Sequence, residues 1–227
     1  MIAVGSLANA VAIGIGSLTG LLIGRKLPEN VRRIVFQGLG LVVLVLGVQM
    51  ALKFRHPLIA VFSLLIGGVA GELLRIEDRL ASLGDIVKRR VNSRDERFTE
   101  GLVNASLMYC VGSMAIIGAF DEGLRGDSTV LLTKAVLDGF ISVALASTYG
   151  LGVMFSAIPV FLYQYGLTLF AVRFQAVFSP AIVDELTGVG GLLIMAIGIN
   201  MLEIQKIKVG NLLPALVVVV VLVKLFV

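Results

Sequence analysis

The residues with the greatest capacity for chemistry lie in one largely apolar segment, between Lys134 and Pro159. Asp138, Ser142 and Tyr149 follow one another there at intervals of four and seven residues, so a helix would place all three on one face. A carboxylate is costly to bury unless it is paired or hydrogen-bonded. The spacing therefore indicates Asp138 as a coupling-ion or proton site, and an ion pair with Lys134 at a membrane edge is the alternative.

The same segment contains the run Ser147-Thr148-Tyr149-Gly150-Leu151-Gly152. Hydroxyl side chains beside two glycines are the composition expected of a discontinuous helix, whose freed backbone groups could coordinate an ion or a solute. Gln164 and Glu185 are weaker members of the same polar set. Glu185 is equally well explained as a carboxylate that stabilises a helix N-terminus.

Four amide side chains in apolar surroundings complete the candidate site: Asn9, Asn104, Gln49 and Asn200. Amides along a pathway could hydrogen-bond a small ion or a polar solute without adding charge. The alternative is that each amide bonds to a neighbouring helix, which contributes roughly 1 kcal/mol in a membrane protein. The sequence leaves both explanations open.

Composition indicates which elements position these residues. The chain has 227 residues, of which 58% are hydrophobic and only 15% are charged, and its mean hydropathy is +1.00. A soluble domain is about half apolar and about a quarter charged, so this chain has too few polar residues to cover a globule. We therefore expect an all-α, polytopic membrane protein whose main partner is the lipid bilayer.

Eight apolar runs are candidate membrane helices, because a bilayer-spanning helix takes roughly 20 residues. They cover residues 2–24, 34–52, 57–74, 101–120, 132–157, 159–175, 186–202 and 209–227. Together they leave no room for a separate soluble catalytic domain.

The basic residues predict the orientation of these helices. If the N-terminus lies outside, 13 of the 19 Lys and Arg residues fall in inner loops, as the positive-inside rule requires. With eight spans the C-terminus also lies outside. The net charge of +4 is explained by these loops, so we expect no nucleic-acid partner.

The one sizeable polar segment runs from Glu72 to Glu100 and holds 14 of the 34 charged residues. Its apolar residues recur at helical spacing and are Ile76, Leu80, Leu83, Val87 and Val91. This pattern predicts a basic amphipathic helix on the inner leaflet. A solvated connector without a function of its own is the alternative.

Two sequence matches indicate an internal repeat. Residues 40–50 match residues 191–201 in both glycines, in the methionine and in an amide before it. A weaker match relates residues 9–17 to residues 104–113, with one residue of slip. These matches pair span one with span four and span two with span seven, and in the predicted topology each pair runs in opposite directions.

The chain is therefore predicted to contain an inverted 3+3 repeat with spans five and six inserted. Residues 1–75 form the first three-helix unit, 76–100 a cytoplasmic connector, and 101–227 the second unit, which includes the inserted pair 132–175. Inverted repeats are typical of secondary transporters, because two similar halves can exchange inward-open and outward-open shapes about a central site.

Glycines on one face of the first span are candidates for helix packing. Gly16, Gly20 and Gly24 form two consecutive small-xxx-small steps, which allow another helix to approach closely. The partner helix could belong to the same chain or to a second copy in a homodimer.

Several classes of function are excluded by residue counts. With one His, His56, and one Cys, Cys110, the chain offers neither a Cys/His metal site nor a disulfide. It contains no Gly-x-x-x-x-Gly-Lys-Ser/Thr loop for nucleotide phosphates. We therefore expect no metal, no cofactor and no enzymatic activity.

The opening residues 5–24, the block 138–159 and the block 190–200 together resemble the YqgA/YdfK-like family of bacterial integral membrane proteins. The resemblance covers essentially the whole chain, and the middle block is its most specific part. It implies a bacterial inner-membrane location and supplies no catalytic residues.

The residues thus predict a secondary transporter or channel for a small ion or polar solute across the bacterial cytoplasmic membrane. A membrane-embedded sensor or scaffold that acts through the basic segment between Arg75 and Glu100 is the alternative.

Overall fold

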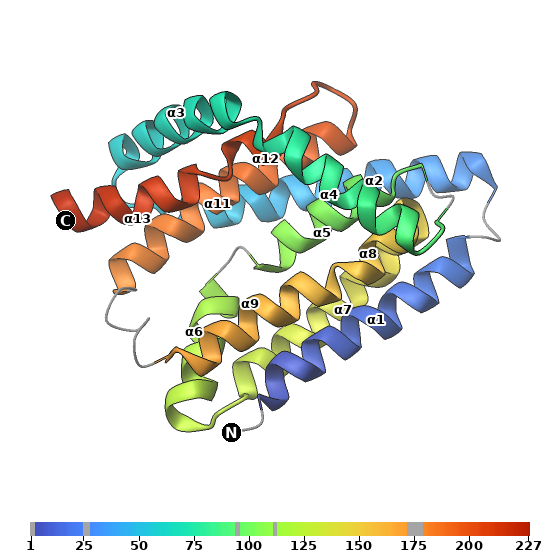
Figure 1. The fold of residues 1–227 in the computed structure, drawn as a ribbon, viewed down its shortest axis with the longest axis horizontal. Helices are drawn as coiled ribbons and strands as arrows, with labels where there is room; N and C mark the ends of the chain where they lie inside the picture. The colour runs from blue at the N-terminus through green and yellow to red at the C-terminus, as the bar shows by residue number, and fades with distance from the viewer. Residues whose placement is uncertain (1–2, 25–27, 94–95, 111–112, 172–178) are drawn as a thin grey trace. The chain divides into compact units, whose positions relative to one another are not determined.

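The computed structural model describes residues 3–24, 28–93, 96–110, 113–171 and 179–227, and the elements of this part of the chain are helices (Figure 1). They are α1 (Val4–Gly24), α2 (Glu29–Ala51), α3 (Pro57–Leu74), α4 (Ile76–Arg90), α5 (Phe98–Cys110), α6 (Ser113–Arg125), α7 (Thr129–Tyr149), α8 (Leu151–Phe155), α9 (Ala157–Leu169), α11 (Pro180–Met201), α12 (Val209–Leu212) and α13 (Ala215–Phe226). Four basic residues used for the orientation, Arg25, Lys26, Arg94 and Arg173, lie outside the described residues, as does Gly112 of the weaker repeat match.

The helices make the chain a polytopic membrane protein, as composition predicts. Six described segments are long and apolar enough to cross a bilayer: Val4–Gly24, Pro57–Leu74, Thr129–Tyr149, Leu151–Leu169, Pro180–Met201 and Val209–Phe226. A seventh span results if α5 and α6, whose axes differ by 60°, are counted as one broken span. The apolar part of α2, Gln37–Ala51, is shorter. Large apolar side chains such as those of Ile15, Phe140 and Leu225 are exposed along these helices, which is the surface that lipid covers.

The expected break within span five is corrected by the structure. Gly150 has φ 77° and ψ −151°, and it separates α7 from the segment Leu151–Leu169, which is long enough to be the next span. The glycine run therefore joins two spans, 129–149 and 151–169, in place of the predicted 132–157 and 159–175. Glycine adopts such a positive φ without steric cost. The predicted span 159–175 begins at Pro159, but Pro159 lies in the first turn of α9, where its missing N–H is tolerated, and the span that contains it begins earlier.

The chain forms two compact units, each built from two separate parts of the sequence. Unit 1 combines residues 1–36 with 83–177, and unit 2 combines residues 37–82 with 178–227.

In unit 1, α1 packs along α7 through its glycine face (Figure 1). Gly16 lies against Gly139, Gly20 against Val143 and Gly24 against Ser147. Because the numbers rise together on both helices, α1 and α7 run parallel. The glycine face is thus used within the chain.

A pair of alanine substitutions tests this contact. A Cβ at Gly20 would overlap the carbonyl oxygen of Val143, whereas a Cβ at Gly14 meets nothing within 4 Å. We expect Gly20→Ala to destabilise the protein by about 1–3 kcal/mol, the usual cost of overpacking. Gly14→Ala should be neutral or stabilise it by up to about 1 kcal/mol. Thermal unfolding in detergent measures both variants, and equal melting temperatures would contradict the close packing of α1 on α7.

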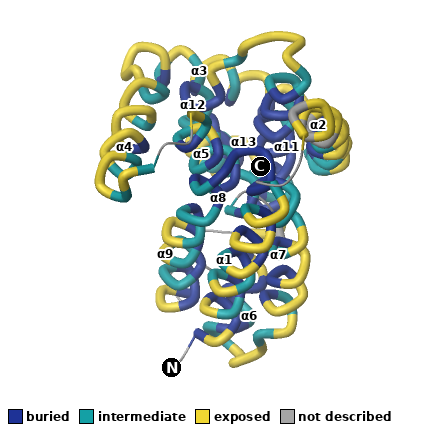
Figure 2. The backbone as a smooth tube through the Cα atoms, turned by 90° about the vertical axis from the view of Figure 1, so that its right-hand side faces the viewer, coloured by how far each residue is buried: buried dark blue, intermediate teal, exposed yellow. Residues whose placement is uncertain are grey.

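In unit 2, α11 is buried over most of its length (Figure 2). It runs antiparallel to the second half of α2, since Gly40 lies against Met201 and Leu202 while Gly188 lies against Phe54. The helix α3 packs on α12 and α13, where Gly71 lies against Asn211 and Gly67 against Ala215.

The polar segment after α3 forms the predicted helix. α4 carries Glu77 and Asp78 in its first turn and Lys88, Arg89 and Arg90 in its last turn, the order that complements a helix dipole. Its position on a leaflet stays a prediction.

Candidate functional site

Four side chains from three helices of unit 1 form a buried cluster, which we call the polar cluster: Asn9 of α1, Lys134 and Asp138 of α7, and Gln164 of α9. Asn9 and Gln164 are 0% exposed, Asp138 5% and Lys134 7%. The amide nitrogen of Asn9 donates to Asp138 Oδ2 at 3.0 Å and to Gln164 Oε1 at 3.1 Å. α1 thereby links α7 and α9 through partners that lie 129 and 155 residues away in the sequence.

Lys134 Nζ pairs with the same carboxylate oxygen, Asp138 Oδ2. The ion pair offered by the spacing is therefore formed, but Asp138 is the tenth residue of α7, about 14 Å along the helix axis. Both partners are buried, and Asp138 lies halfway along a helix of spanning length. A charged pair at that depth is expensive to desolvate, and it is tolerated only when hydrogen bonds accompany it.

The hydroxyl groups of Ser142 on α7 and Tyr109 on α5 extend the cluster toward α5. Tyr109 OH and Ser142 Oγ are 2.7 Å apart, and both residues are buried. Lys134 Nζ lies 5.7 Å from the centroid of the Tyr109 ring, a distance at which an ammonium is attracted by the ring face.

The polar cluster is not fully hydrogen-bonded. Among the described residues, Asn9 Oδ1 and Gln164 Nε2 are buried without a partner. Each unsatisfied buried group costs about 1–3 kcal/mol. One free acceptor and one free donor beside a buried ion pair are what a site that holds a small polar ligand requires.

A second buried carboxylate in unit 1 was missed from the sequence. Glu122 of α6 is 2% exposed and accepts from Gly5 N at 2.6 Å and from Ser128 Oγ at 2.7 Å. Its other oxygen accepts from Ser6 Oγ and Thr168 Oγ1. Beside Asp121 and Arg125, Glu122 looks in the sequence like part of a solvated loop that follows an apolar run.

The remaining predicted residues of unit 1 lie near the end of α7. Asn104 Nδ2 donates to Tyr149 OH at 3.3 Å, so this amide bonds to a neighbouring helix, which is the alternative explanation given for the amides. Of the predicted set, the structure thus brings together Asn9, Asp138 and Gln164, places Ser142 beside Tyr109, and pairs Asn104 with Tyr149.

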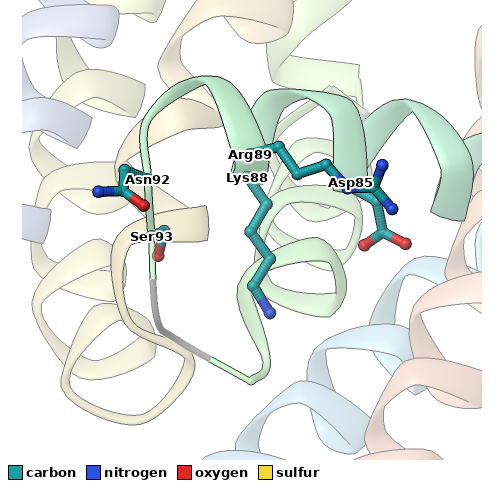
Figure 3. A pocket seen from close by; sticks show the side chains of 5 residues that line it. All are labelled: Asp85, Lys88, Arg89, Asn92 and Ser93. Carbon is teal, nitrogen blue, oxygen red and sulfur yellow. The ribbon is translucent and has the colours of Figure 1, made fainter.

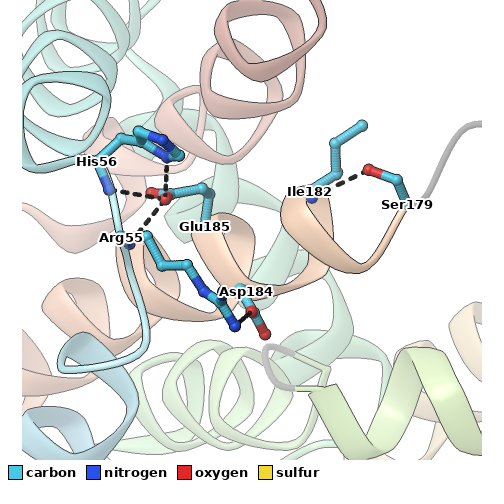
Figure 4. A network of polar contacts seen from close by, with 6 residues as sticks. All are labelled: Arg55, His56, Ser179, Ile182, Asp184 and Glu185. Atoms are coloured by element: carbon cyan, nitrogen blue, oxygen red, sulfur yellow. Dashed lines mark hydrogen bonds and ion pairs between the residues drawn. The ribbon is translucent and has the colours of Figure 1, made fainter. Parts of the chain in front are cut away.

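The predicted residues of unit 2 take local roles. Glu185 Oε1 accepts from the backbone N–H groups of Arg55 at 2.8 Å and His56 at 2.9 Å and contacts His56 Nδ1 at 2.9 Å (Figure 4). These groups immediately precede α3, so Glu185 stabilises the N-terminus of that helix and not its own. Asn200 bonds to both backbone groups of Ile207 and closes the loop after α11. Gln49 is exposed on α2.

A shallow pocket of about 410 Å³ lies at the end of α4 (Figure 3). It is lined by Asp85, Lys88, Arg89, Asn92 and Ser93. Within the part of the chain that the structure describes, no three His, Cys, Asp or Glu side chains gather into a metal site.

Membrane-spanning helices around a buried ionic cluster define a polytopic α-helical membrane protein. Comparisons with known proteins give the family: residues 4–224 match the model described as "Protein of unknown function (DUF554)", and the chain belongs to this family. It is 33% identical to "Uncharacterized membrane protein YdfK" of Bacillus subtilis (strain 168) over 218 residues, which cover 94% of this chain and 93% of that protein. It is 29% identical to "Uncharacterized protein YqgA" of Escherichia coli (strain K12) with the same coverage. These relatives confirm the resemblance noted from the sequence. No solved structure matches the chain.

Proposed function

We propose that the protein is a secondary transporter or channel for a small ion or polar solute and that the polar cluster is its binding site. The observation that carries the proposal is the buried Lys134–Asp138 pair, halfway along a spanning helix, next to amide groups with unused hydrogen-bonding capacity. In membrane proteins, ionisable residues at such depth mark substrate and ion pathways. Asp138 would bind the substrate, and Asn9 and Gln164 would orient it.

Contacts in unit 2 support the inverted repeat that the proposal includes. Residue numbers in the second repeat block are 151 higher than in the first, so Gly40 corresponds to Gly191 and Gly47 to Gly198. Gly40 lies against Leu202, and its equivalent Gly191 lies against Ala51, which is the residue equivalent to Leu202.

The second glycine pair repeats this reciprocity. Gly47 lies against Met195, and Gly198 lies against Leu44, the residue equivalent to Met195. All four repeated glycines thus serve one antiparallel contact in equivalent ways. A two-fold axis between antiparallel helices is perpendicular to them, so in a membrane it lies in the bilayer plane, as in transporters with inverted repeats.

A flux assay tests the function. The purified protein is reconstituted into sealed vesicles and screened with a broad panel of ions and metabolites. We expect Asp138→Asn to lower the flux roughly tenfold or more, because it removes a charged partner worth roughly 1.5–3 kcal/mol. Asp127→Asn, at an exposed loop position, is the control and should leave the flux unchanged. No flux above empty vesicles, or full flux in Asp138→Asn, contradicts the proposal.

We further propose a bacterial cytoplasmic membrane location with both termini outside. The basic residues of α4 and the Lys206–Lys208 loop then face the cytoplasm, as the positive-inside rule requires.

The second candidate function is a sensor or scaffold acting through α4. The observation that favours it is the pocket beside Lys88 and Arg89 in a helix of strong amphipathic character. Replacing Lys88, Arg89 and Arg90 by glutamine should then abolish crosslinking to a partner, while Asp138→Asn leaves it intact.

A further inference from the structure

We propose that the polar cluster binds a small monovalent cation, of ammonium or alkali type, at the place on Asp138 that the Lys134 ammonium occupies in this structure. This inference rests on the proposed transport function and names its substrate class. Lys134 then acts as a tethered competitor that holds the site closed when the substrate is absent.

The balance of buried charge favours a cation. Within the described residues of unit 1, the buried ionic side chains are two carboxylates, Glu122 and Asp138, and one ammonium, Lys134. Uncompensated charge is expensive in a low-dielectric interior. One additional monovalent cation brings the formal charge of this group to zero. A divalent cation would leave a positive charge, and an anion would make the imbalance worse.

The atoms around Asn9 supply the ligands that a cation needs. Its amide nitrogen lies between Asp138 Oδ2 and Gln164 Oε1, and its own oxygen has no described partner. The cluster therefore holds one carboxylate and two amide oxygens, of which Asn9 Oδ1 is free to accept, and such oxygens are what hard cations and ammonium groups prefer. For an anion the cluster offers only the Lys134 ammonium and the free Gln164 amide.

The position of the Lys134 ammonium shows that the site accommodates a positively charged group. Its ammonium sits between a carboxylate and the face of the Tyr109 ring, which is an arrangement suited to any small cation with N–H donors. The four-carbon stem of lysine is flexible enough to leave.

The geometry also gives a destination for the displaced ammonium. A basic residue four positions before an acidic one is the less favourable order on a helix, because side chains lean toward the helix N-terminus. A released Lys134 therefore projects toward the start of α7. Ser128, which immediately precedes α7, is bonded to Glu122. Lys134 would thus exchange Asp138 for Glu122, and each carboxylate would retain one cation.

Thermal unfolding of the full-length protein in detergent tests this inference. Wild type, Lys134→Met and Lys134→Gln are titrated with ammonium, methylammonium, sodium and potassium chloride. N-methylglucamine chloride keeps the ionic strength constant and supplies a cation much larger than those tested. We expect saturable stabilisation by ammonium-type cations, by alkali cations or by both, and the panel distinguishes these sources.

The lysine variants should bind more tightly than wild type. A tethered group competes at an effective concentration of about millimolar or above, so its removal should lower the half-saturating cation concentration about tenfold or more. The double variant Lys134→Met/Asp138→Asn should lose the response. If Lys134→Met does not fold, Lys134→Gln, which keeps a donor for Asp138, tests the tighter binding. Wild type compared with Asp138→Asn then tests the loss of the response.

The outcomes separate this inference from the proposed function. If the melting temperature of each protein, wild type and both lysine variants, is the same in every salt, the cation site is overturned. A solute flux that Asp138→Asn abolishes, without any cation response, supports transport and overturns the inference. A cation response without flux in vesicles supports the site and contradicts transport.

Discussion

Replacement of Lys134 by methionine is expected to destabilise the protein by about 3–5 kcal/mol, the cost of leaving one partner of a buried ion pair without its counter-charge. Lys134 Nζ and Asn9 Nδ2 both donate to Asp138 Oδ2. Without the lysine, Asp138 would keep only the Asn9 amide as a described partner. Methionine preserves most of the length and volume of the lysine side chain. The change therefore isolates the charge.

The double variant Lys134→Met/Asp138→Asn should recover most of this loss, since it buries no unpaired charge and the amide oxygen introduced at position 138 can still accept from Asn9. Thermal unfolding in detergent, with N-methylglucamine as the salt, measures the single and double variants as a double-mutant cycle. Lys224→Met, at an exposed position of α13, is the matched control and should change stability by less than about 0.5 kcal/mol. If the effects of the two single substitutions simply add, Lys134 and Asp138 do not stabilise each other.

The sequence predicts the apolar helices because the signal for them is local, although six or seven of the described segments are long enough to span where eight spans are predicted. Continuous apolar runs and the small-xxx-small spacing of Gly16, Gly20 and Gly24 depend on neighbours a few residues apart. Boundaries fail where a local signal has two physical explanations. The sequence places Gly150 within a span and Pro159 at the start of the next one, because a glycine-rich run is compatible with either a broken helix or a junction between two helices.

The meeting of polar residues could only be predicted in part. Asp138 was found from its own helix, and Asn9 and Gln164 were found as amides in apolar runs. Their convergence depends on how α1 packs between α7 and α9, over separations of 129 and 155 residues. No pattern within one helix contains that information.

The proposed repeat gives wrong roles when it is used to assign them to polar residues. Gln49 and Asn200 occupy equivalent positions in the two repeat blocks, yet Gln49 is exposed and Asn200 closes a loop by bonding Ile207. The equivalence of glycines is preserved because both members serve the same helix contact. Side chains outside that contact are free to diverge, so the sequence match between the two blocks predicts helix packing better than it predicts chemistry.

Glu122→Ala is expected to destabilise unit 1 by roughly 3 kcal/mol or more, because it removes the acceptor of four donors from different parts of the unit and each donor left unsatisfied costs about 1–3 kcal/mol. The donor Gly5 N belongs to the first turn of α1, whose free N–H groups and helix dipole favour a carboxylate there. Glu122→Gln should cost less, since its amide oxygen can still accept two of these bonds.

The neighbouring acidic residue supplies the control for this experiment. Asp121 forms an ion pair with Arg125, whose side chain is 74% exposed, so Asp121→Ala should cost less than about 1 kcal/mol. Thermal unfolding in detergent ranks the three variants, and hydrogen exchange at the start of α1 reports whether Gly5 has lost its acceptor. If Glu122→Ala and Asp121→Ala have the same melting temperature, Glu122 does not anchor α1. A selective loss of protection at Gly5 in Glu122→Ala would show that this carboxylate fixes the helix that carries Asn9, and so holds the polar cluster in register.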